Sequence, residues 1–274
     1  MHEISATLKA SEFKELSRLM HSVSGVKLTA GKESLMQSRL SPRLRALRLG
    51  SYGEYLTHIG NDSTQAELTR FVDLLTTNKT DFFREVRHFE YLRTKVLPRL
   101  RERGGVARFW SAACSSGEEP YSLAMLIAEE WNGANTPCAR ILATDLSTRM
   151  LAKATAAVYD DVVVKGLTTS RISRHMENVA ATDTSQFRVR KSLRAMVQVA
   201  QLNLVKNDWP MTGPFDVIMC RNVMIYFDVA TQERLINRCW DLLAPGGTLL
   251  VGHSESLTRL RHSFSYVVPA TYVR

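Results

Sequence analysis

Two adjacent stretches decide the fold: Val106-Ala-Arg-Phe-Trp-Ser-Ala-Ala113, and Cys114-Ser-Ser-Gly-Glu-Glu119 followed by Pro120. The first is an apolar run that ends in small residues, as a buried strand does, and the second is a short polar turn. Pro120 suits the start of a helix, and apolar residues recur after it at Leu123 and Ile127. A strand, a turn and a helix in this order are typical of a parallel sheet with crossover helices.

The same alternation continues toward the C-terminus. Further strands are predicted at 140–145, 196–203, 215–220 and 248–252, and more strand-like residues occur at 266–268 and 271–273. Helices are predicted at 150–157 and 231–243, and Pro245-Gly246-Gly247 is predicted to be a turn between helix and strand. This order predicts a doubly wound α/β sheet. Two short runs, 186–190 and 195–199, break it and predict a small antiparallel β-subdomain inserted at 168–200.

The N-terminal part has a helical period. Apolar residues recur at Phe13, Leu16 and Met20, and Ser51 with Glu54 forms a capping-box pattern. A later helical run reaches Pro98, where a helix must end, kink or restart. We therefore expect three parts, which are an all-helical domain (1–77), a linker with a helix (78–105) and the α/β domain (106–274).

Composition restricts the class of protein. The 274 residues are 45% hydrophobic and 23% charged, which excludes a disordered chain. Lys and Arg number 36 against 27 acids, a net charge of +9 that favours an acidic partner such as nucleic acid, a membrane surface or an acidic protein. The four cysteines form no C-x-x-C pair, so no structural zinc module is expected. No apolar run approaches the roughly 20 residues of a membrane span, and the first residues include no apolar signal region, so we expect a soluble cytoplasmic protein.

The turn at 114–119 is the first candidate site, because ligands of doubly wound sheets bind outside the carboxyl ends of the strands. Its single glycine and two acids suit a hydroxyl-rich or cationic ligand better than a pyrophosphate. Asp145 ends the second strand, where a carboxylate can accept hydrogen bonds from ribose hydroxyls. A nucleoside bearing a sulfonium, S-adenosylmethionine, fits Glu118 and Asp145. The alternative is that Asp145 caps the following helix. Asn203 could meet an adenine edge or be an ordinary strand-to-loop residue.

Three other stretches of the sequence have motif-like features. The stretch 25–32 resembles a phosphate loop, but its glycines have the wrong spacing. Gly252-His-Ser-Glu-Ser256 resembles a nucleophile elbow, but Ser256 replaces the last glycine and no acid follows it. In the stretch 78–85, Thr80 or Asp81 is a predicted N-cap, which puts Arg84 on the first turn of a helix. That is an unfavourable position for a cation, and it indicates either a functional residue or an ordinary solvated one.

Five motifs together resemble the bacterial chemotaxis receptor methyltransferases, the CheR family. They are Thr76-Thr-Asn-Lys-Thr-Asp-Phe-Phe-Arg-Glu85, Trp110-Ser-Ala-Ala-Cys-Ser-Ser-Gly-Glu-Glu-Pro-Tyr-Ser122, Ala143-Thr-Asp-Leu-Ser147, Phe215-Asp-Val-Ile-Met-Cys-Arg-Asn-Val-Met-Ile-Tyr-Phe227 and Gly252-His-Ser-Glu-Ser256. The resemblance covers essentially the whole chain in order. It implies an N-terminal helical domain, an S-adenosylmethionine-dependent methyltransferase domain and an inserted β-subdomain.

The resemblance also implies the chemistry: methyl transfer to glutamate side chains on the cytoplasmic domains of methyl-accepting chemoreceptors, with S-adenosylhomocysteine as product and no metal. The implied cofactor contacts are Asn78, Thr80, Arg84, Glu118, Asp145, Asn203, Leu204, Arg221 and Asn222. The linker would then be a lid over the cofactor. The resemblance places Tyr226 near the reacting methyl, whereas the residues alone favour a core aromatic there.

One departure from the family concerns the partner. Relatives that dock on a receptor's C-terminal peptide have a glycine-rich turn in the β-subdomain, and the stretch 177–185 has no glycine, so peptide tethering is not expected. Arg39, Arg43, Arg45 and Arg48 form either a docking face for acidic receptor helices or a solvated helix face. Neither nucleic acid nor membrane insertion is expected.

The implied substrate explains why no general base is needed. Glutamate, with an ordinary pKa of about 4.3, is already ionised at neutral pH. We expect Arg84 to orient a carboxylate and Tyr226 to shape the methyl pocket. Two alternatives stay open: a methyltransferase acting on RNA or a small molecule, and a non-catalytic adaptor that senses the cofactor.

Overall fold

The structure is a computed structural model that describes residues 7–131, 138–179 and 185–274. These residues form two units, each with its own core. The helical unit contains the described residues up to Thr77 together with Tyr226–Thr231, and the α/β unit contains the described residues of Asn78–Ile225 and Gln232–Arg274. None of the described helices is both long and apolar enough to cross a membrane.

The helical unit is built from α1 (Ala10–Ser24), α2 (Glu33–Leu47), α3 (Tyr52–Asn61) and α4 (Ala66–Leu75). Each helix buries a stripe at the spacing of one helical face, such as Leu16 and Met20 on α1. The predicted cap of α3 is present, because the Ser51 hydroxyl accepts from the Glu54 N–H at 3.1 Å. The Glu54 carboxylate reaches back to the Gly50 N–H instead of to the cap residue itself.

The four arginines, three on α2 and Arg48 at its C-cap, do not form one free face. Arg39 donates to the carbonyls of Leu75 and Thr76, and so satisfies the C-terminal end of α4. Arg43 pairs with the buried carboxylate of Glu67. Only Arg45 and Arg48 have exposed side chains, so the expected docking face is half as large as the sequence suggests.

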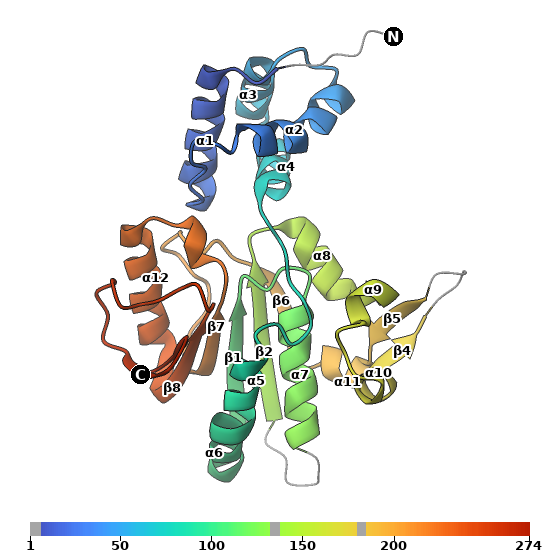
Figure 1. Cartoon of the computed structure of the whole chain (residues 1–274), viewed down its shortest axis with the longest axis vertical. Helices are drawn as coiled ribbons and strands as arrows, with labels where there is room; N and C mark the ends of the chain where they lie inside the picture. Colours follow the sequence, from blue (N-terminus) through green and yellow to red (C-terminus); the bar gives the residue numbers. More distant parts are fainter. Residues whose placement is uncertain (1–6, 132–137, 180–184) are drawn as a thin grey trace. The chain divides into compact units, whose positions relative to one another are not determined.

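The α/β unit is built on a seven-stranded sheet in the order β6-β2-β1-β7-β8-β10-β9. Figure 1 labels five of these strands, β6, β2, β1, β7 and β8. The strands are β1 (Val106–Ala112), β2 (Cys138–Asp145), β6 (Val197–Gln201), β7 (Phe215–Cys220), β8 (Leu243–Val251), β9 (Ser265–Val268) and β10 (Thr271–Val273). Strands β6, β2, β1, β7 and β8 pair in parallel, and β10 is antiparallel to both β8 and β9. The chain winds outward from β1 to β6 and then returns to β7 beside β1. The switch point of this doubly wound sheet therefore lies between β1 and β7.

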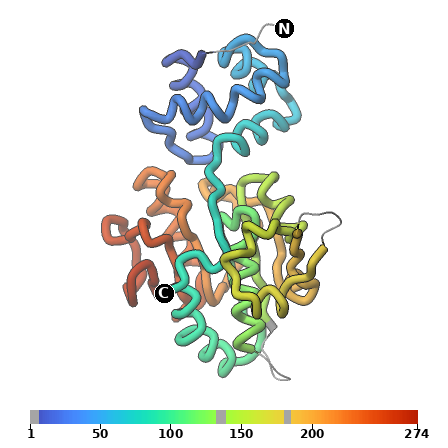
Figure 2. Tube along the Cα trace, turned by 45° about the vertical axis from the view of Figure 1, so that its right-hand side comes forward, coloured from blue at the N-terminus to red at the C-terminus, as the bar shows by residue number. Residues whose placement is uncertain are grey.

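The main crossover helices are α7 (Glu118–Glu130), α8 (Thr148–Ala156) and α12 (Val229–Leu242). Helix α7 is buried over most of its surface, well beyond the predicted single stripe, because its residues 120–127 are all buried. Before the sheet, α5 (Val86–Tyr91), a π-helical turn (Leu92–Val96) and α6 (Leu97–Arg103) follow one another without a break, as the tube in Figure 2 shows. The π turn lets the helix restart near Pro98, which stands in the first turn of α6. Proline is tolerated there because first-turn N–H groups have no partner within the helix.

The small antiparallel sheet differs from the expected insert at 168–200. Its strands are β3 (Val158–Asp160), β5 (Gln186–Val189) and β4 (Met176–Asn178), and it is accompanied by the short helices α9 (Asp161–Val164), α10 (Thr169–His175) and α11 (Lys191–Arg194). The run 195–199 is predicted both for this insert and for the strand at 196–203; the first assignment is wrong and the second is confirmed, since β6 pairs in parallel with β2 in the main sheet. Strand β6 is an edge strand with mixed exposure, which explains why its sequence alternates like a hairpin strand. The glycine-free turn falls partly on 180–184, outside the described residues.

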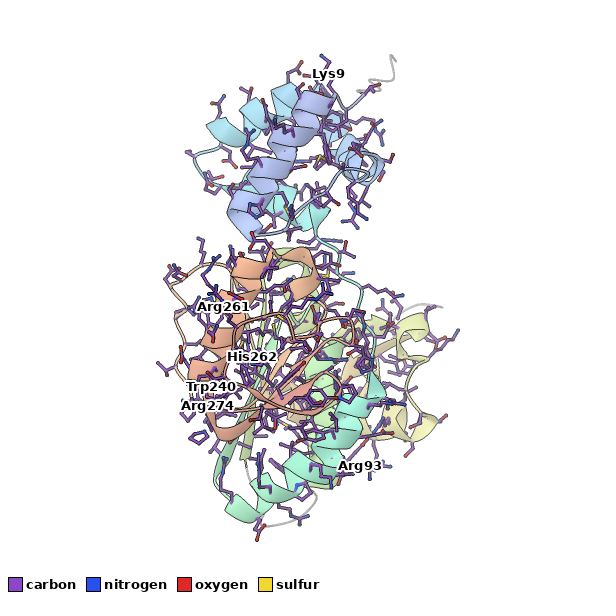
Figure 3. The ribbon with its side chains drawn as sticks, turned by 60° about the vertical axis from the view of Figure 1, so that its left-hand side comes forward. Lys9, Arg93, Trp240, Arg261, His262 and Arg274 are labelled. Atoms are coloured by element: carbon purple, nitrogen blue, oxygen red, sulfur yellow. The ribbon has the colours of Figure 1, made fainter. Side chains whose placement is uncertain are left out.

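The C-terminal strands close the sheet. The expected Pro-Gly-Gly turn is an irregularity within the continuous strand β8, because the register with β7 jumps between Phe215 and Val217. Arg274 fixes the chain end: it lies 5.4 Å from the Trp240 ring centroid and donates to the Leu243 carbonyl (Figure 3).

Candidate cofactor site

The turn after β1 is held against the end of β2 by an acid. The Cys114 N–H donates to the Thr144 carbonyl at 2.8 Å, and the Ser115 N–H donates to Asp145 Oδ2 at 2.8 Å. The other oxygen of Asp145 accepts from the Ser147 N–H at 2.9 Å. Asp145 is buried at the carboxyl end of a parallel strand beside the switch point, where ligands of this fold bind.

The alternative role for Asp145, capping the next helix, is wrong. Helix α8 begins after Ser147, whose hydroxyl accepts from the Met150 N–H at 3.2 Å. A serine at the N-cap is sufficient for that helix. The position of Asp145 two residues earlier therefore requires another explanation, and holding the turn after β1 is part of it.

Glu118 is a second buried acid at this edge, on the first turn of α7. Both its oxygens accept from the Ser116 hydroxyl, at 2.8 and 3.0 Å. Burial raises the pKa of Glu118 although the Ser116 hydroxyl opposes it, and the nearby charge of Asp81 raises it further. A ligand that brings a positive charge or hydroxyl donors would stabilise the ionised form of Glu118.

The linker segment 78–85 is attached to the same edge. The Ser115 hydroxyl donates to the Asn78 carbonyl at 2.9 Å, and the Phe83 N–H donates to the Ser122 hydroxyl of α7 at 2.8 Å. Arg84 donates to the Lys79 carbonyl at 2.7 Å and so closes the segment into a loop. Thr80, half-buried, lies within this loop.

Arg84 is not on a helix, contrary to the sequence prediction. Helix α5 begins at Val86 and its N-cap is Glu85, whose φ of 59° is left-handed. The predicted caps, Thr80 and Asp81, instead belong to the loop that Arg84 closes. Arg84 is therefore not an unfavourable cation on the first turn of a helix. The half-buried Arg84 side chain lies in a loop at the sheet edge.

A buried ion-pair network joins this linker to β7. Arg221, which follows β7, pairs with Glu119 Oε2 at 2.9 Å and with Glu85 Oε2 at 3.1 Å, and also donates to the Arg84 carbonyl. Asn222 donates from Nδ2 to Glu85 Oε1 at 3.2 Å. Burial alone would raise the pKa of Glu85, but the charge of Arg221 and the Asn222 amide lower it. The described contacts of Arg221 and Asn222 thus hold protein groups in place.

Glu255 fixes the loop that follows β7. Its Oε2 accepts from the N–H groups of Gly252 at 2.6 Å and Asn222 at 2.7 Å, and its Oε1 accepts from Met224 at 2.7 Å and Ile225 at 3.2 Å. A Cβ at Gly252 would lie 2.9 Å from the backbone N of Asn222 and still closer to Asn222 Nδ2 and Glu255 Oε2, so glycine is favoured there. The motif that resembles a nucleophile elbow is therefore a clamp on the β7 loop.

Strained backbone collects at the same edge. Among the described residues, Phe83, Glu85, Ala113, Ser115 and Asn222 have positive φ between 50° and 64° without being glycine. Such conformations cost energy and persist where the surroundings enforce them, typically at ligand sites. They lie on three segments: the linker, the turn after β1 and the loop after β7.

The remaining predicted residues lie less centrally. Asn203 and Leu204 follow β6, the neighbour of β2, and the Leu202 N–H donates to the Asp145 carbonyl at 3.0 Å. The Asn203 side chain accepts from the Val205 N–H at 3.1 Å. Tyr226 ends a 3₁₀ turn (Met224–Tyr226) and groups with the helical unit, where its carbonyl accepts from the Lys27 N–H. Its place beside a methyl group stays a prediction.

Sequence reasoning gave no role to Glu85, Glu119 or Glu255. All three stood inside quoted motifs, but their partners lie far away in the chain. Only Glu255 gave a local signal, as an acid three residues after a glycine that ends a strand.

The parallel sheet and its acidic switch-point edge define a nucleoside-binding α/β protein, and the buried Glu118 and Asp145 fit a donor-rich, cationic nucleoside. Comparison with known families agrees. The CheR methyltransferase all-alpha domain matches residues 11–76, and the CheR methyltransferase SAM binding domain matches residues 78–273. The chain belongs to the CheR methyltransferase family and is an S-adenosylmethionine-dependent methyltransferase.

Similar proteins cover nearly the whole chain. The chemotaxis protein methyltransferase of Klebsiella aerogenes is 38% identical over 94% of this chain and 87% of its own length. That of Escherichia coli K12 is 38% identical over 94% and 88%, and the chemotaxis protein methyltransferase 2 of Pseudomonas aeruginosa is 39% identical over 95% and 92%. The resemblance inferred from five motifs is thus confirmed over both units.

Proposed function

We propose that this protein transfers the methyl group of S-adenosylmethionine to glutamate side chains on the cytoplasmic domains of chemoreceptors, forming methyl esters. The observation that carries the proposal is its membership of a family whose similar members are chemotaxis protein methyltransferases. The proposed place of action is the cytoplasm, where those receptor domains lie.

The proposed cofactor residues divide into two sets. Glu118 and Asp145 would bind hydroxyl or ammonium groups, since both are buried acids at the strand ends. Arg84 would bind a carboxylate, because its guanidinium offers a planar fork of donors. When bound, S-adenosylmethionine supplies an electrophilic sulfonium methyl.

The further contacts that the family resemblance implies are also proposals. Asn78, Thr80 and Arg84 would form a lid from the linker, while Asn203 and Leu204 would border the adenine. Arg221 and Asn222 would act mainly by holding Glu85 and the β7 loop. An ionised glutamate needs no base, so the task of this chain would be to orient it and exclude water.

The test combines a labelled methyl group with a chemical property of the product. The full chain is incubated with methyl-labelled S-adenosylmethionine and a chemoreceptor cytoplasmic fragment, and mild base is then added. A glutamyl methyl ester releases volatile label, whereas methylated RNA bases or amines do not. A matched receptor fragment with its acceptor glutamates changed to alanine is the control. Label that resists base, or appears equally on the control fragment, would contradict the proposal.

Asp145→Asn tests the cofactor site separately. One oxygen stays as an acceptor, the other becomes an NH₂ group that faces an N–H donor, and the charge is lost. We expect binding of S-adenosylhomocysteine to weaken by about 10- to 100-fold, the equivalent of one charged hydrogen bond. Asp208→Asn, an exposed acid after β6, is the matched control. Calorimetry gives the affinity, and far-UV circular dichroism equal to that of the control, with a cooperative thermal transition above the assay temperature, would show that the fold is intact.

A further inference from the structure

Three side chains with metal-binding atoms meet where α5 begins and β8 ends. His88 Nδ1 lies 3.4 Å from Glu85 Oε2, and His253 Nε2 lies 4.0 Å from the same oxygen. One ligand atom from each of the three residues lies within 4.8 Å of the others. The two imidazole rings meet edge to face, with centroids 5.1 Å apart. The sequence did not predict this cluster, because His253 is far from the other two in the chain.

His88 supplies an independent reason to expect a ligand. The residue is 1% exposed, and within the described chain neither ring nitrogen has a hydrogen-bond partner. Buried polar groups are nearly always bonded to protein, ordered water or an ion, so an imidazole with two unused nitrogens indicates partners other than the described protein atoms. An ion in the cluster would take Nδ1, the nitrogen on the Glu85 side. Its Nδ1 faces the carboxylate of Glu85 at a distance too long and poorly directed for a hydrogen bond.

We propose that Glu85, His88 and His253 bind one divalent transition-metal ion of the zinc class. Two imidazoles and one carboxylate form a typical ligand set for such ions and leave a fourth position for water. Tetrahedral zinc with bonds of 2.0–2.2 Å separates neighbouring ligand atoms by about 3.4 Å. The His88–Glu85 pair already has this spacing, and the side chain of His253, 46% exposed, has room to close the remaining distance.

The groups around the cluster suit this role. Glu85 Oε1 accepts from Asn222 Nδ2 at 3.2 Å and from the His253 N–H at 3.3 Å, so the carboxylate is oriented as a metal ligand usually is. Arg221 is the opposing feature, since it lies 3.1 Å from Glu85 Oε2. If the ion takes that oxygen, Arg221 keeps its pair with Glu119 and its bond to the Arg84 carbonyl.

The ion would connect the start of α5 to the loop after β8, both in the α/β unit. It would act beside Arg84, which the proposed function places at the cofactor, but the binding itself does not depend on that function. Binding and methyl transfer can therefore be measured separately.

The experiment uses the full chain, stripped with a chelator and titrated with zinc chloride in a calorimeter. We expect one saturable site. His253→Asn and His88→Gln should each lower its affinity by at least about 10- to 100-fold, the loss caused by removing even an outer-shell partner. His58→Asn removes an exposed histidine of α3 and is the matched control, with unchanged affinity expected. Zinc should raise the thermal midpoint of the wild type and the control more than that of His253→Asn.

Cobalt chloride identifies the ligands. Visible bands of a four-coordinate ion without a thiolate charge-transfer band would support the imidazole and carboxylate set. Any of three results would overturn the proposal: the absence of a saturable zinc site, a thiolate charge-transfer band, or an unchanged zinc affinity in His253→Asn. His253 is half-exposed, so its variant is expected to fold even if His88→Gln does not.

Discussion

Replacing Glu255 by glutamine tests whether one carboxylate holds the loop after β7. The carboxylate accepts four backbone N–H groups, two at each oxygen. In Glu255→Gln one oxygen becomes an NH₂ group, which faces two N–H donors and can accept from neither. Two bonds to a charged group are lost, at about 1.5–3 kcal/mol each. Burial raises the pKa of the Glu255 carboxyl, so the neutral amide is easier to bury than the carboxylate. We therefore expect the free energy of unfolding to fall by an amount at the lower end of this range, about 3 kcal/mol.

The chain provides a local probe for this measurement. Its four tryptophans, Trp110, Trp131, Trp209 and Trp240, all belong to the α/β unit, so tryptophan fluorescence during urea unfolding reports that unit alone. Glu102→Gln, an exposed acid of α6, is the matched control and should leave the midpoint unchanged. A midpoint for Glu255→Gln equal to that of the control would refute the clamp. Binding of S-adenosylhomocysteine should also weaken, since Asn222 is among the clamped residues.

Three further predictions concern other charges. Burial would raise the pKa of Glu67, but hydrogen bonds from Arg43 and Tyr55 lower it below the ordinary 4.5. The ionised carboxylate therefore stabilises the fold fully above pH 4.5, and this contribution is lost as the pH falls through the lower pKa of the folded state. The hydrogen-exchange protection factors of α2 and α4, which correct for slower intrinsic exchange at low pH, should fall in that range, and less so in Glu67→Gln, which has no ionised carboxylate to lose. Glu118→Gln should raise the free energy of unfolding at neutral pH, because a carboxyl group with a raised pKa destabilises the fold when it is ionised. The same variant should weaken cofactor binding by about 10-fold or more. A variant that is less stable and still binds the cofactor normally would contradict this prediction. Changing Arg45 and Arg48 to Glu should raise KM for a receptor fragment without changing cofactor affinity. If the methylation kinetics of the unchanged protein are the same at low and high salt, these arginines do not form a docking face.

The sequence predicted the fold well where its signals are local. The strand-turn-helix at 106–131 and the strands at 215–220 and 248–252 could be identified because buried parallel strands are continuous apolar runs. Edge strand β6 was partly misassigned, since a half-exposed strand alternates whether its neighbour is parallel or antiparallel. The start of α5 was also misplaced. Glu85 caps it from a left-handed conformation that no propensity scale favours for glutamate, and the structure enforces it through Arg221 and Asn222.

The candidate site was predictable only in part, for a related reason. Acids at strand ends can be recognised from the order of the elements, and this singled out Asp145 and Glu118. The partners of an acid cannot be recognised in this way, because they come from segments that only the folded sheet brings together. Glu119 follows Glu118 directly, yet it pairs with Ser111 and Arg221. Sequence alone offered no means to tell these two neighbours apart.

The distribution of acids explains how a chain with a net charge of +9 maintains an acidic edge. Glu85 and Glu119 share the single positive charge of Arg221, and Glu255 is surrounded by backbone N–H groups, so these three carboxylates are engaged within the protein. Among the described residues, Glu118 forms no ion pair within 4 Å, and burial raises its pKa although the charge of Lys153 opposes this. In the proposed function, a cationic nucleoside would therefore meet a carboxylate that no cation pairs with directly. Because the network through Arg221 also anchors the linker, the residues proposed as a lid would be attached to this edge before the cofactor binds.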